Sequence, residues 1–239
     1  MDANKLDKSL IYKNFKKDLI ERFGSERAEM IWKYANNQVC ELEQSIPGAD
    51  STDKQFVFPA VALFRAIDNY FPGQALELTR AYGKKTGLKM KKIFSRITAL
   101  PGIPGLMWKN MDKIAAKMSD GYECKDVHVT DSECSLDVVG CPLYDRARKL
   151  GTPEAAQMIC CMDKEYMTGF RGIDYVRTKS VAEGDDCCDY RLKKSDLKYH
   201  KKSDDKSTKM PDNKMLMGIG LVFATIMLFL TFRNRNIKK

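Results

Sequence analysis

The chain has 239 residues, of which 44% are hydrophobic and 31% are charged. This balance is typical of a globular protein and excludes a disordered or fibrous chain. The formal net charge of +9 is unevenly distributed, because residues 191–239 contain 13 basic and 4 acidic residues, whereas residues 1–190 are neutral overall. A neutral body with a basic tail argues against nucleic-acid binding, and the positive charge belongs to whatever the tail contacts.

The first 120 residues are predicted to form a helical N-terminal region. One segment, ended by Gly24, is predicted from an apolar stripe at helical spacing that comprises Leu6, Leu10, Phe15, Leu19 and Phe23. Further helices are predicted at 25–42, 56–70, 74–97 and 106–118. Pro-Gly pairs mark several of their boundaries, because these residues end regular structure.

The pattern changes after Gly121 to short runs of alternating apolar and polar residues. Strands are predicted at 122–130, 134–139, 173–181 and 187–193, and helices at 142–150 and 153–169. This order predicts the α+β class: a helical N-terminal half, then a small antiparallel sheet covered by helices. Residues 1–120 and 121–193 are expected to form one body.

The C-terminal part predicts a membrane anchor. Residues 215–232 are 18 consecutive uncharged residues, which as a helix would be about 27 Å long and would span the hydrocarbon core. Residues 194–213 are predicted to form a basic linker whose lysines approach anionic lipid headgroups, and 233–239 form a basic tail. Because the N-terminus lacks a signal-peptide pattern, we expect a single C-terminal transmembrane helix with the body in the cytoplasm.

The eight cysteines are the most informative residues for chemistry. In a reducing cytosol they are expected to be free thiols or metal ligands rather than disulfides. Only two histidines are present, which excludes a histidine-rich metal site, and GxSxG, GxGxxG and P-loop motifs are absent from the sequence.

Cys141 precedes Pro142, a residue type favoured at the first position of a helix. The thiol is therefore predicted to lie at the helix N-cap, where free N–H groups and the helix dipole stabilise a thiolate. A thiolate there would serve as a nucleophile or a metal ligand. The alternative is a purely structural small residue in a tight strand-to-helix turn.

Two more groups are predicted near Cys141. Cys160 and Asp163 are three residues apart on a predicted helix and share one face, where they would bind a metal or a polar substrate. On the last predicted strand, alternation puts Cys188 on the inward face with Tyr190. Asp185 lies in the turn that leads into this strand.

These residues carry a family resemblance. The stretch from Cys141 to Arg191 resembles the L-2-amino-thiazoline-4-carboxylic acid hydrolase family, which shows a cysteine opening a helix, a Gly-x-Pro-Glu turn, a Cys-x-x-Asp helix and a closing Gly-Asp-x-x-Cys-Asp-Phe strand. The matching residues here are Cys141, Gly151, Pro153, Glu154, Cys160, Asp163, Gly184, Asp185, Cys188 and Asp189. Tyr190 replaces the usual phenylalanine, a change that keeps an aromatic ring.

The resemblance implies a hydrolase that opens a cyclic amidine by attack at C2 and breaks a C–N or C–S bond. Its catalytic residues would be Cys141, Cys160, Asp163, Asp185 and Cys188, surrounding one pocket from which Asp189 points away. Arg171 or Arg177 would pair with the carboxylate of the small-molecule substrate.

Two mechanisms and two other classes of protein remain open from the sequence. Attack would use either the Cys141 thiolate without a cofactor, or water activated by zinc bound to Cys141, Cys160, Asp163 and Cys188. The main alternative function is a membrane-anchored, cysteine-rich protein that binds a metal or a thiol-reactive ligand without catalysis. The last is an interaction domain in which the cysteines only pack.

Overall fold

The structure, a computed structural model, describes residues 4–195. Its first half is helical and comprises α1 (Lys5–Lys8), α2 (Phe15–Phe23), α3 (Ser25–Ser45), the π-helical turn η1 (Asp53–Val57), α4 (Phe58–Tyr70), α5 (Ala75–Ile97), α6 (Ile103–Lys109) and α7 (Met111–Ser119). Its second half comprises β1 (Glu123–Val129), β2 (Glu133–Gly140), α8 (Pro142–Lys149), η2 (Pro153–Ala155), α9 (Ala156–Met167), β3 (Ile173–Val176), η3 (Val181–Glu183) and β4 (Cys188–Lys194). The predicted α+β class is confirmed.

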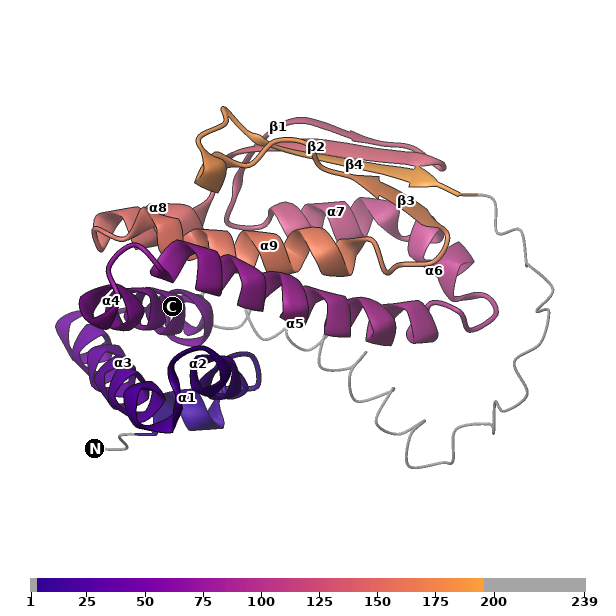
Figure 1. The fold of residues 1–239 in the computed structure, drawn as a ribbon. Helices are drawn as coiled ribbons and strands as arrows, with labels where there is room; N and C mark the ends of the chain where they lie inside the picture. Colours follow the sequence, from indigo (N-terminus) through magenta and orange to yellow (C-terminus); the bar gives the residue numbers. More distant parts are fainter. Residues whose placement is uncertain (1–3, 196–239) are drawn as a thin grey trace, which may run out of the picture.

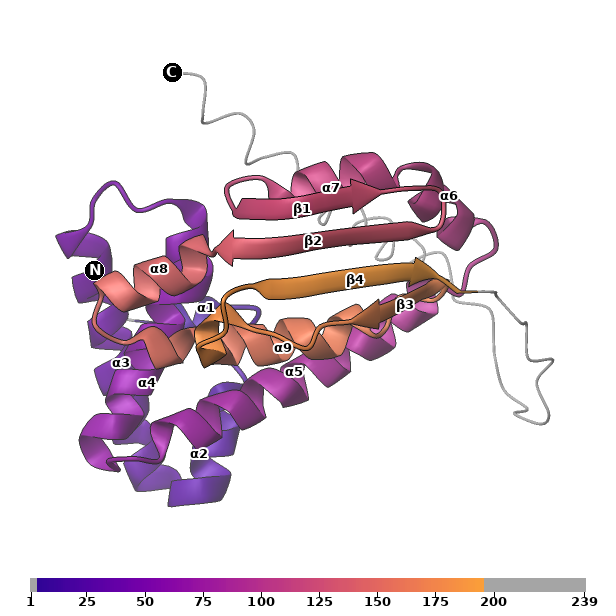
Figure 2. The ribbon, with the colours of Figure 1, turned by 90° about the horizontal axis from the view of Figure 1, so that it is seen from above.

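The four strands form one antiparallel sheet in the order β1-β2-β4-β3. Figure 1 shows α7, α8 and α9 on one face of this sheet, with α5 below α9 and farther from the sheet, and Figure 2 shows β2 and β4 in the middle of the sheet. In the central pair Val138 lies opposite Cys188, and Leu136 lies opposite Tyr190. This register turns Cys188 and Tyr190 toward the helices, because Val138 and Leu136 are both buried there.

Two of the predicted helices are interrupted. The stripe from Leu6 to Phe23 is divided between α1 and α2, and Leu10 is exposed in the turn between them. Ser9 makes this turn, because its side-chain oxygen accepts a hydrogen bond from the backbone N–H of Tyr12 at 3.1 Å. The helix predicted at 106–118 is likewise two helices, α6 and α7, which meet at an asparagine cap, Asn110.

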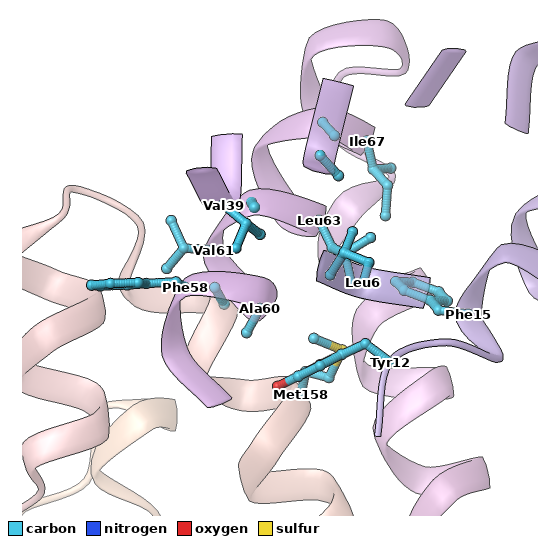
Figure 3. Packing of buried hydrophobic residues seen from close by; sticks show 14 of the residues in the cluster. Leu6, Tyr12, Phe15, Val39, Phe58, Ala60, Val61, Leu63, Ile67 and Met158 are labelled. Carbon is cyan, nitrogen blue, oxygen red and sulfur yellow. The ribbon is translucent and has the colours of Figure 1, made fainter. Parts of the chain in front are cut away.

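The buried side chains form two clusters. The first joins the N-terminal helices to the inner faces of α8 and α9, and Figure 3 shows Met158 of α9 beside Tyr12, in the same cluster as Leu6 of α1 and Leu63 of α4. The second lies under the sheet and contains Trp108, Leu136 and residues of β3 and β4. Helix α9 therefore lies between the two clusters, and its residues contribute to both.

Helix α9 packs closely on α5 because α5 has glycines at the contact. A Cβ atom at Gly83 would overlap the backbone carbonyl of Met158, and one at Gly87 would overlap the carbonyl of Met162. The missing side chains let the two helix backbones approach each other directly. The position of α9 relative to α5 is therefore fixed by backbone contact rather than by adaptable side chains.

Gly83→Ala is expected to destabilise the protein by about 3 kcal/mol, because the new methyl group must displace a helix backbone. Helix propensity alone would give the opposite sign, since alanine favours a helix by about 1 kcal/mol over glycine. Gly105 in α6 has open space around its Cα and provides the control, because Gly105→Ala should be neutral or stabilising. Chemical denaturation measures both, and a neutral Gly83→Ala variant would refute the close contact.

Within residues 4–195 no helix combines the length and the apolar character that crossing a membrane requires. The predicted span at 215–232, the tail at 233–239 and the predicted linker beyond Ser195 lie outside the described residues.

Candidate active site

Cys141 occupies the N-cap of α8, as predicted. Its backbone is extended (φ −109°, ψ 111°), Pro142 follows at the first helical position, and the carbonyl of Cys141 accepts the first helical hydrogen bond from Asp145 N–H at 2.9 Å. Cys141 is the single residue between β2, a central strand of the sheet, and α8, so its thiol lies where the strand ends and the helix begins. The sulfur packs at the edge of the second cluster and is only partly exposed.

The expected stabilisation of a Cys141 thiolate is outweighed by burial. Burial raises the pKa of the Cys141 thiol, and the backbone N–H groups of Tyr144 and Leu143 lower it by less. The charge of Cys188 raises this pKa further. The N–H groups at the helix N-terminus thus lower the thiol pKa, as predicted. Desolvation raises this pKa by more than they lower it, so the pKa of Cys141 lies above its usual value.

Asp163 lies on α9 and is the centre of a polar network. Its carboxylate accepts hydrogen bonds from Arg177 Nη1 at 3.0 Å and from the Tyr190 hydroxyl at 2.9 Å. Arg177 follows β3 directly, and its Nη2 donates to the backbone carbonyl of Cys160 at 2.9 Å. One guanidinium therefore links the carboxylate of Asp163 to the backbone of Cys160, and it fixes the predicted Cys-x-x-Asp face of α9.

Three tyrosines surround this ion pair. Tyr166 and Tyr190 form hydrogen bonds to Asp163, and burial followed by the Asp163 charge raises the pKa of both phenols well above the usual value. The same two causes raise the pKa of Tyr175. Within residues 4–195 the Tyr175 hydroxyl is buried without a hydrogen-bond partner, as is the Ser180 hydroxyl. All three phenols therefore stay protonated and able to donate at neutral pH.

The Cys188 sulfur approaches this network from β4. It accepts a hydrogen bond from the backbone N–H of Val181 at 3.3 Å, a contact that a thiolate would strengthen. Cys188 lies close enough for its charge to raise the pKa of both Cys141 and Cys160, and the charges of Cys141 and Asp163 also raise the pKa of Cys160. Burial is the main cause of the high Cys160 pKa. The structure thus brings four predicted site residues together: Cys141, Cys160, Asp163 and Cys188.

The fifth predicted residue, Asp185, has another position. Its side chain is exposed, and its carboxylate accepts a hydrogen bond from the backbone N–H of Ser180 at 2.7 Å. This contact closes the loop that presents the Val181 N–H to Cys188, so Asp185 positions the loop. Its role in the site is therefore indirect.

The neighbouring motif residue, Asp189, also holds this loop. It accepts hydrogen bonds from the Thr178 and Lys179 backbone N–H groups at 2.8 and 2.6 Å. Burial would raise the pKa of Asp189, but these bonds and the Thr178 hydroxyl lower it overall. The sheet register turns its side chain away from Cys188 and Tyr190, as the alternation of β4 predicted.

The two candidate arginines are separated by the fold. Arg171 is exposed, and its Nε donates to the Ser95 hydroxyl at 3.3 Å, at the end of α5. Arg177 is buried in the cluster and paired with Asp163. The sequence analysis did not predict the polar role of the tyrosines. The one indication in the sequence is Tyr190, which has a hydroxyl group where the family usually has phenylalanine.

The arrangement does not favour a metal ion. Among residues 4–195 no group of three or more His, Cys, Asp and Glu side chains is arranged to hold one. Asp163 is already occupied by an arginine and two phenols, which compete with a cation for the same oxygens. The zinc set considered from the sequence thus does not fit the geometry, and we derive no step through a metal.

A surface hollow of about 380 Å³ lies elsewhere, between the N-terminal turn and α3, and it is lined by residues such as Asp7 and Trp32. Asp7 already accepts hydrogen bonds from the Trp32 indole there. None of the predicted site residues contributes to its wall.

The chain was compared with solved structures, with curated proteins and with models of protein families. One matching solved structure, from work described as "Probing the function of heme distortion in the H-NOX family", is 15% identical, with 84% of this chain and 99% of that chain covered. Its TM-score of 0.30 is too low to support an argument about this protein. No curated protein matches the chain. The family model described as L-2-amino-thiazoline-4-carboxylic acid hydrolase matches residues 53–192, more than half of the sequence, and the chain therefore belongs to this family.

Proposed function

We propose that this protein hydrolyses a small cyclic amidine of the 2-amino-thiazoline-4-carboxylate type, with Cys141 as the nucleophile. The observation that carries the proposal is the convergence of Cys141, Cys160 and Cys188 with the Asp163–Arg177 pair where α8, α9 and β4 meet. Family membership supplies the substrate class. Cys141 is favoured as the nucleophile because it is partly exposed and faces the N–H groups of a helix N-terminus.

The proposed reaction has two steps and consumes one water molecule. The Cys141 thiolate attacks C2 of the ring, and the ring C2–S or C2–N bond breaks, with a proton passing to the leaving sulfur or nitrogen. The ring-opened group is then held on Cys141, as an isothiourea if the C2–S bond has broken or as an imidodithiocarbonate if the C2–N bond has broken. Water attacks the same carbon, the C–S bond to Cys141 breaks, and the product leaves as a carbamoylated cysteine.

The surrounding residues take separate roles in this proposal. Asp163 and Arg177 are positioning residues in this proposal. The Arg177 guanidinium donates to the Asp163 carboxylate and to the backbone carbonyl of Cys160, and Asp163 also accepts from the Tyr190 hydroxyl, so the pair holds α9 and β4 together beside Cys141. The buried Tyr175 hydroxyl has a hydrogen to donate, and we assign it to the leaving atom. Cys160 has a raised pKa and remains neutral, so it shapes the site without competing as a nucleophile.

The test is turnover of 2-amino-thiazoline-4-carboxylate by the full chain. We expect a product heavier than the substrate by one water molecule. A free thiol in that product indicates ring C–S cleavage, and a free amine indicates C–N cleavage. Acid quenching during turnover should trap the adduct on the peptide that contains Cys141. A substrate that raises the melting temperature but yields no product would instead support the binding protein without catalysis.

A further inference from the structure

The C-terminal half of α5 has an outward face with an unusual composition. Residues 84–97 contain six basic residues and no acidic one. At about 100° per residue, five of the exposed side chains fall within an arc of about 140°. This α5 face consists of Leu88, Lys89, Lys92, Ile93 and Arg96.

The α5 face is opposite the one that packs inside the protein. Gly87, Phe94 and Ile97 are buried against α9 and its surroundings, so the α5 face points away from α9 and from the thiol cluster. A surface that contacted another body here would therefore leave the candidate active site uncovered.

Large apolar side chains interrupt the basic ones along this face. Leu88 and Ile93 are 40% and 48% exposed, and Leu100 and Leu106, which follow in the turn after α5 and in α6, are 38% and 56% exposed. Single exposed apolar residues need no explanation, but here four occur between positions 88 and 106 of the chain. Cations alternating with leucine and isoleucine on one helix face are typical of helices that lie on a membrane.

The positive charges of the α5 face are not neutralised by the protein itself. Lys85, just outside the face, pairs with Asp18, and Lys84 approaches Glu165. By contrast, within residues 4–195 no acidic side chain forms an ion pair with Lys89, Lys92 or Arg96. These three cations are therefore available to an external anionic surface.

The described chain ends near the C-terminal end of α5, the helix that carries this face. The Ser195 N–H donates to the carbonyl of Gly172, which also accepts from the Trp108 indole of α6 at 2.8 Å. The adjacent Arg171 N–H donates to the side chain of Thr98, directly after α5. Figures 1 and 2 both show the ends of β4 and α5 at the same end of the molecule, together with α6. The sequence after Ser195 contains the uncharged run 215–232, so a membrane held by that run would lie within reach of α5.

We propose that the α5 face, extended by Leu100 and Leu106, lies on an anionic membrane surface. Lys89, Lys92 and Arg96 contact the lipid headgroups, and the apolar side chains enter the boundary between headgroups and acyl chains. The basic linker and the α5 face then act on the same surface, and the thiol cluster stays on the far side of α5. This proposal is independent of the proposed catalysis.

The test is lysine footprinting of the full chain on vesicles, read for each lysine by mass spectrometry after brief acetylation. On phosphatidylcholine vesicles containing about 30% phosphatidylserine, acetylation of Lys89 and Lys92 should fall at least about tenfold relative to pure phosphatidylcholine, because each cation at such a surface contributes about fivefold to binding. Lys33, Lys54 and Lys149 are exposed on α3, η1 and α8 and serve as controls within the same sample. Their acetylation should not change.

A matched pair of variants separates the apolar from the charged contribution. Leu88→Ser/Ile93→Ser should reduce the protection of Lys89 and Lys92 while leaving the melting temperature unchanged, because both side chains are exposed. Met30→Ser, an equally exposed apolar site on α3, should leave the protection intact. Equal acetylation on both kinds of vesicle, or equal protection of the control lysines, would overturn the proposal. Protection by single-stranded RNA but not by phosphatidylserine would also overturn it and assign the α5 face to nucleic acid.

Discussion

Cys141→Ser is expected to lower kcat/KM for 2-amino-thiazoline-4-carboxylate by at least about 10³-fold, since removal of a nucleophile has effects of this size or larger in enzymes that form covalent intermediates. The substitution keeps the size of the side chain and leaves the N-cap position suited to a serine, so the melting temperature should hardly change. Steady-state kinetics and thermal unfolding measure the two quantities.

Cys161→Ser is the matched control for this result. Cys161 is the neighbour of Cys160 on α9, and its thiol lies beside Arg80 and Glu183 rather than Asp163. Its replacement should leave kcat/KM within about twofold, as expected for a residue outside the reacting atoms. If the two variants lost activity equally and in proportion to their stability, Cys141 would be a packing residue.

The pH dependence gives a second readout for Cys141. Because burial holds the pKa of the Cys141 thiol above its usual value, only a small fraction is thiolate at neutral pH. Below the pKa this fraction rises about tenfold per pH unit, so alkylation of Cys141 by iodoacetamide should accelerate about 100-fold from pH 6 to pH 8. A rate independent of pH over this range would show that the helix N-terminus outweighs burial after all.

Asp163→Ala is expected to destabilise the protein by about 3–5 kcal/mol, because it leaves a buried guanidinium without its counterion. The Arg177 side chain is only 4% exposed, and that of Asp163 is 18% exposed, so water cannot replace the lost carboxylate. Tyr190 and Tyr166 lose an acceptor in the same step. Urea denaturation measures the loss.

Two further variants separate the charge from the hydrogen bonds. Arg177→Met in the Asp163→Ala background removes the unpaired charge and should restore much of the stability. Tyr190→Phe removes two hydrogen bonds, one donated to Asp163 and one accepted from Arg177, and restores the usual family residue, so it should cost about 2 kcal/mol. A cost below about 1 kcal/mol for Asp163→Ala would mean that the ion pair does not hold this part of the fold together.

The features that sequence predicted best are those that depend on near neighbours. The position of Cys141 at a helix start follows from the proline beside it, and the inward direction of Cys188 follows from the two-residue period of a strand. The ends of β1, β2 and α5 agree with prediction within two residues for the same reason. Interruptions at Ser9 and Asn110 were missed, because a single side-chain hydrogen bond to the backbone can override an apolar period.

The features that sequence did not predict depend on residues brought together from distant parts of the chain. No local sequence pattern distinguishes Arg171 from Arg177. Arg177 is the partner of Asp163 because the chain after β3 passes close to α9, whereas Arg171 lies at the end of α5. The net sign of the Cys141 pKa shift depends on burial by other elements, which periodicity does not measure. The tyrosine at position 190 was read as a conserved ring, yet its hydroxyl is what contacts Asp163.

The central place of β4 has a consequence for how this site tolerates insertions and deletions. Because β4 is bonded on both edges, its pairing with β2 and β3 holds it in register at every residue. Deletion of one residue from the adjacent pair Cys187-Cys188 would keep one cysteine. Unless the loop that begins at Ser180 adjusts, the deletion would turn the following side chains of β4 to the opposite face of the sheet. Such a deletion would remove only one of the two adjacent cysteines. The side chains that face the helices would nevertheless change from the Cys188 thiol and the Tyr190 phenol to the Asp189 carboxylate and the Arg191 guanidinium. For this chain, the length of the loop before β4 therefore matters as much as the identity of the residues that follow it.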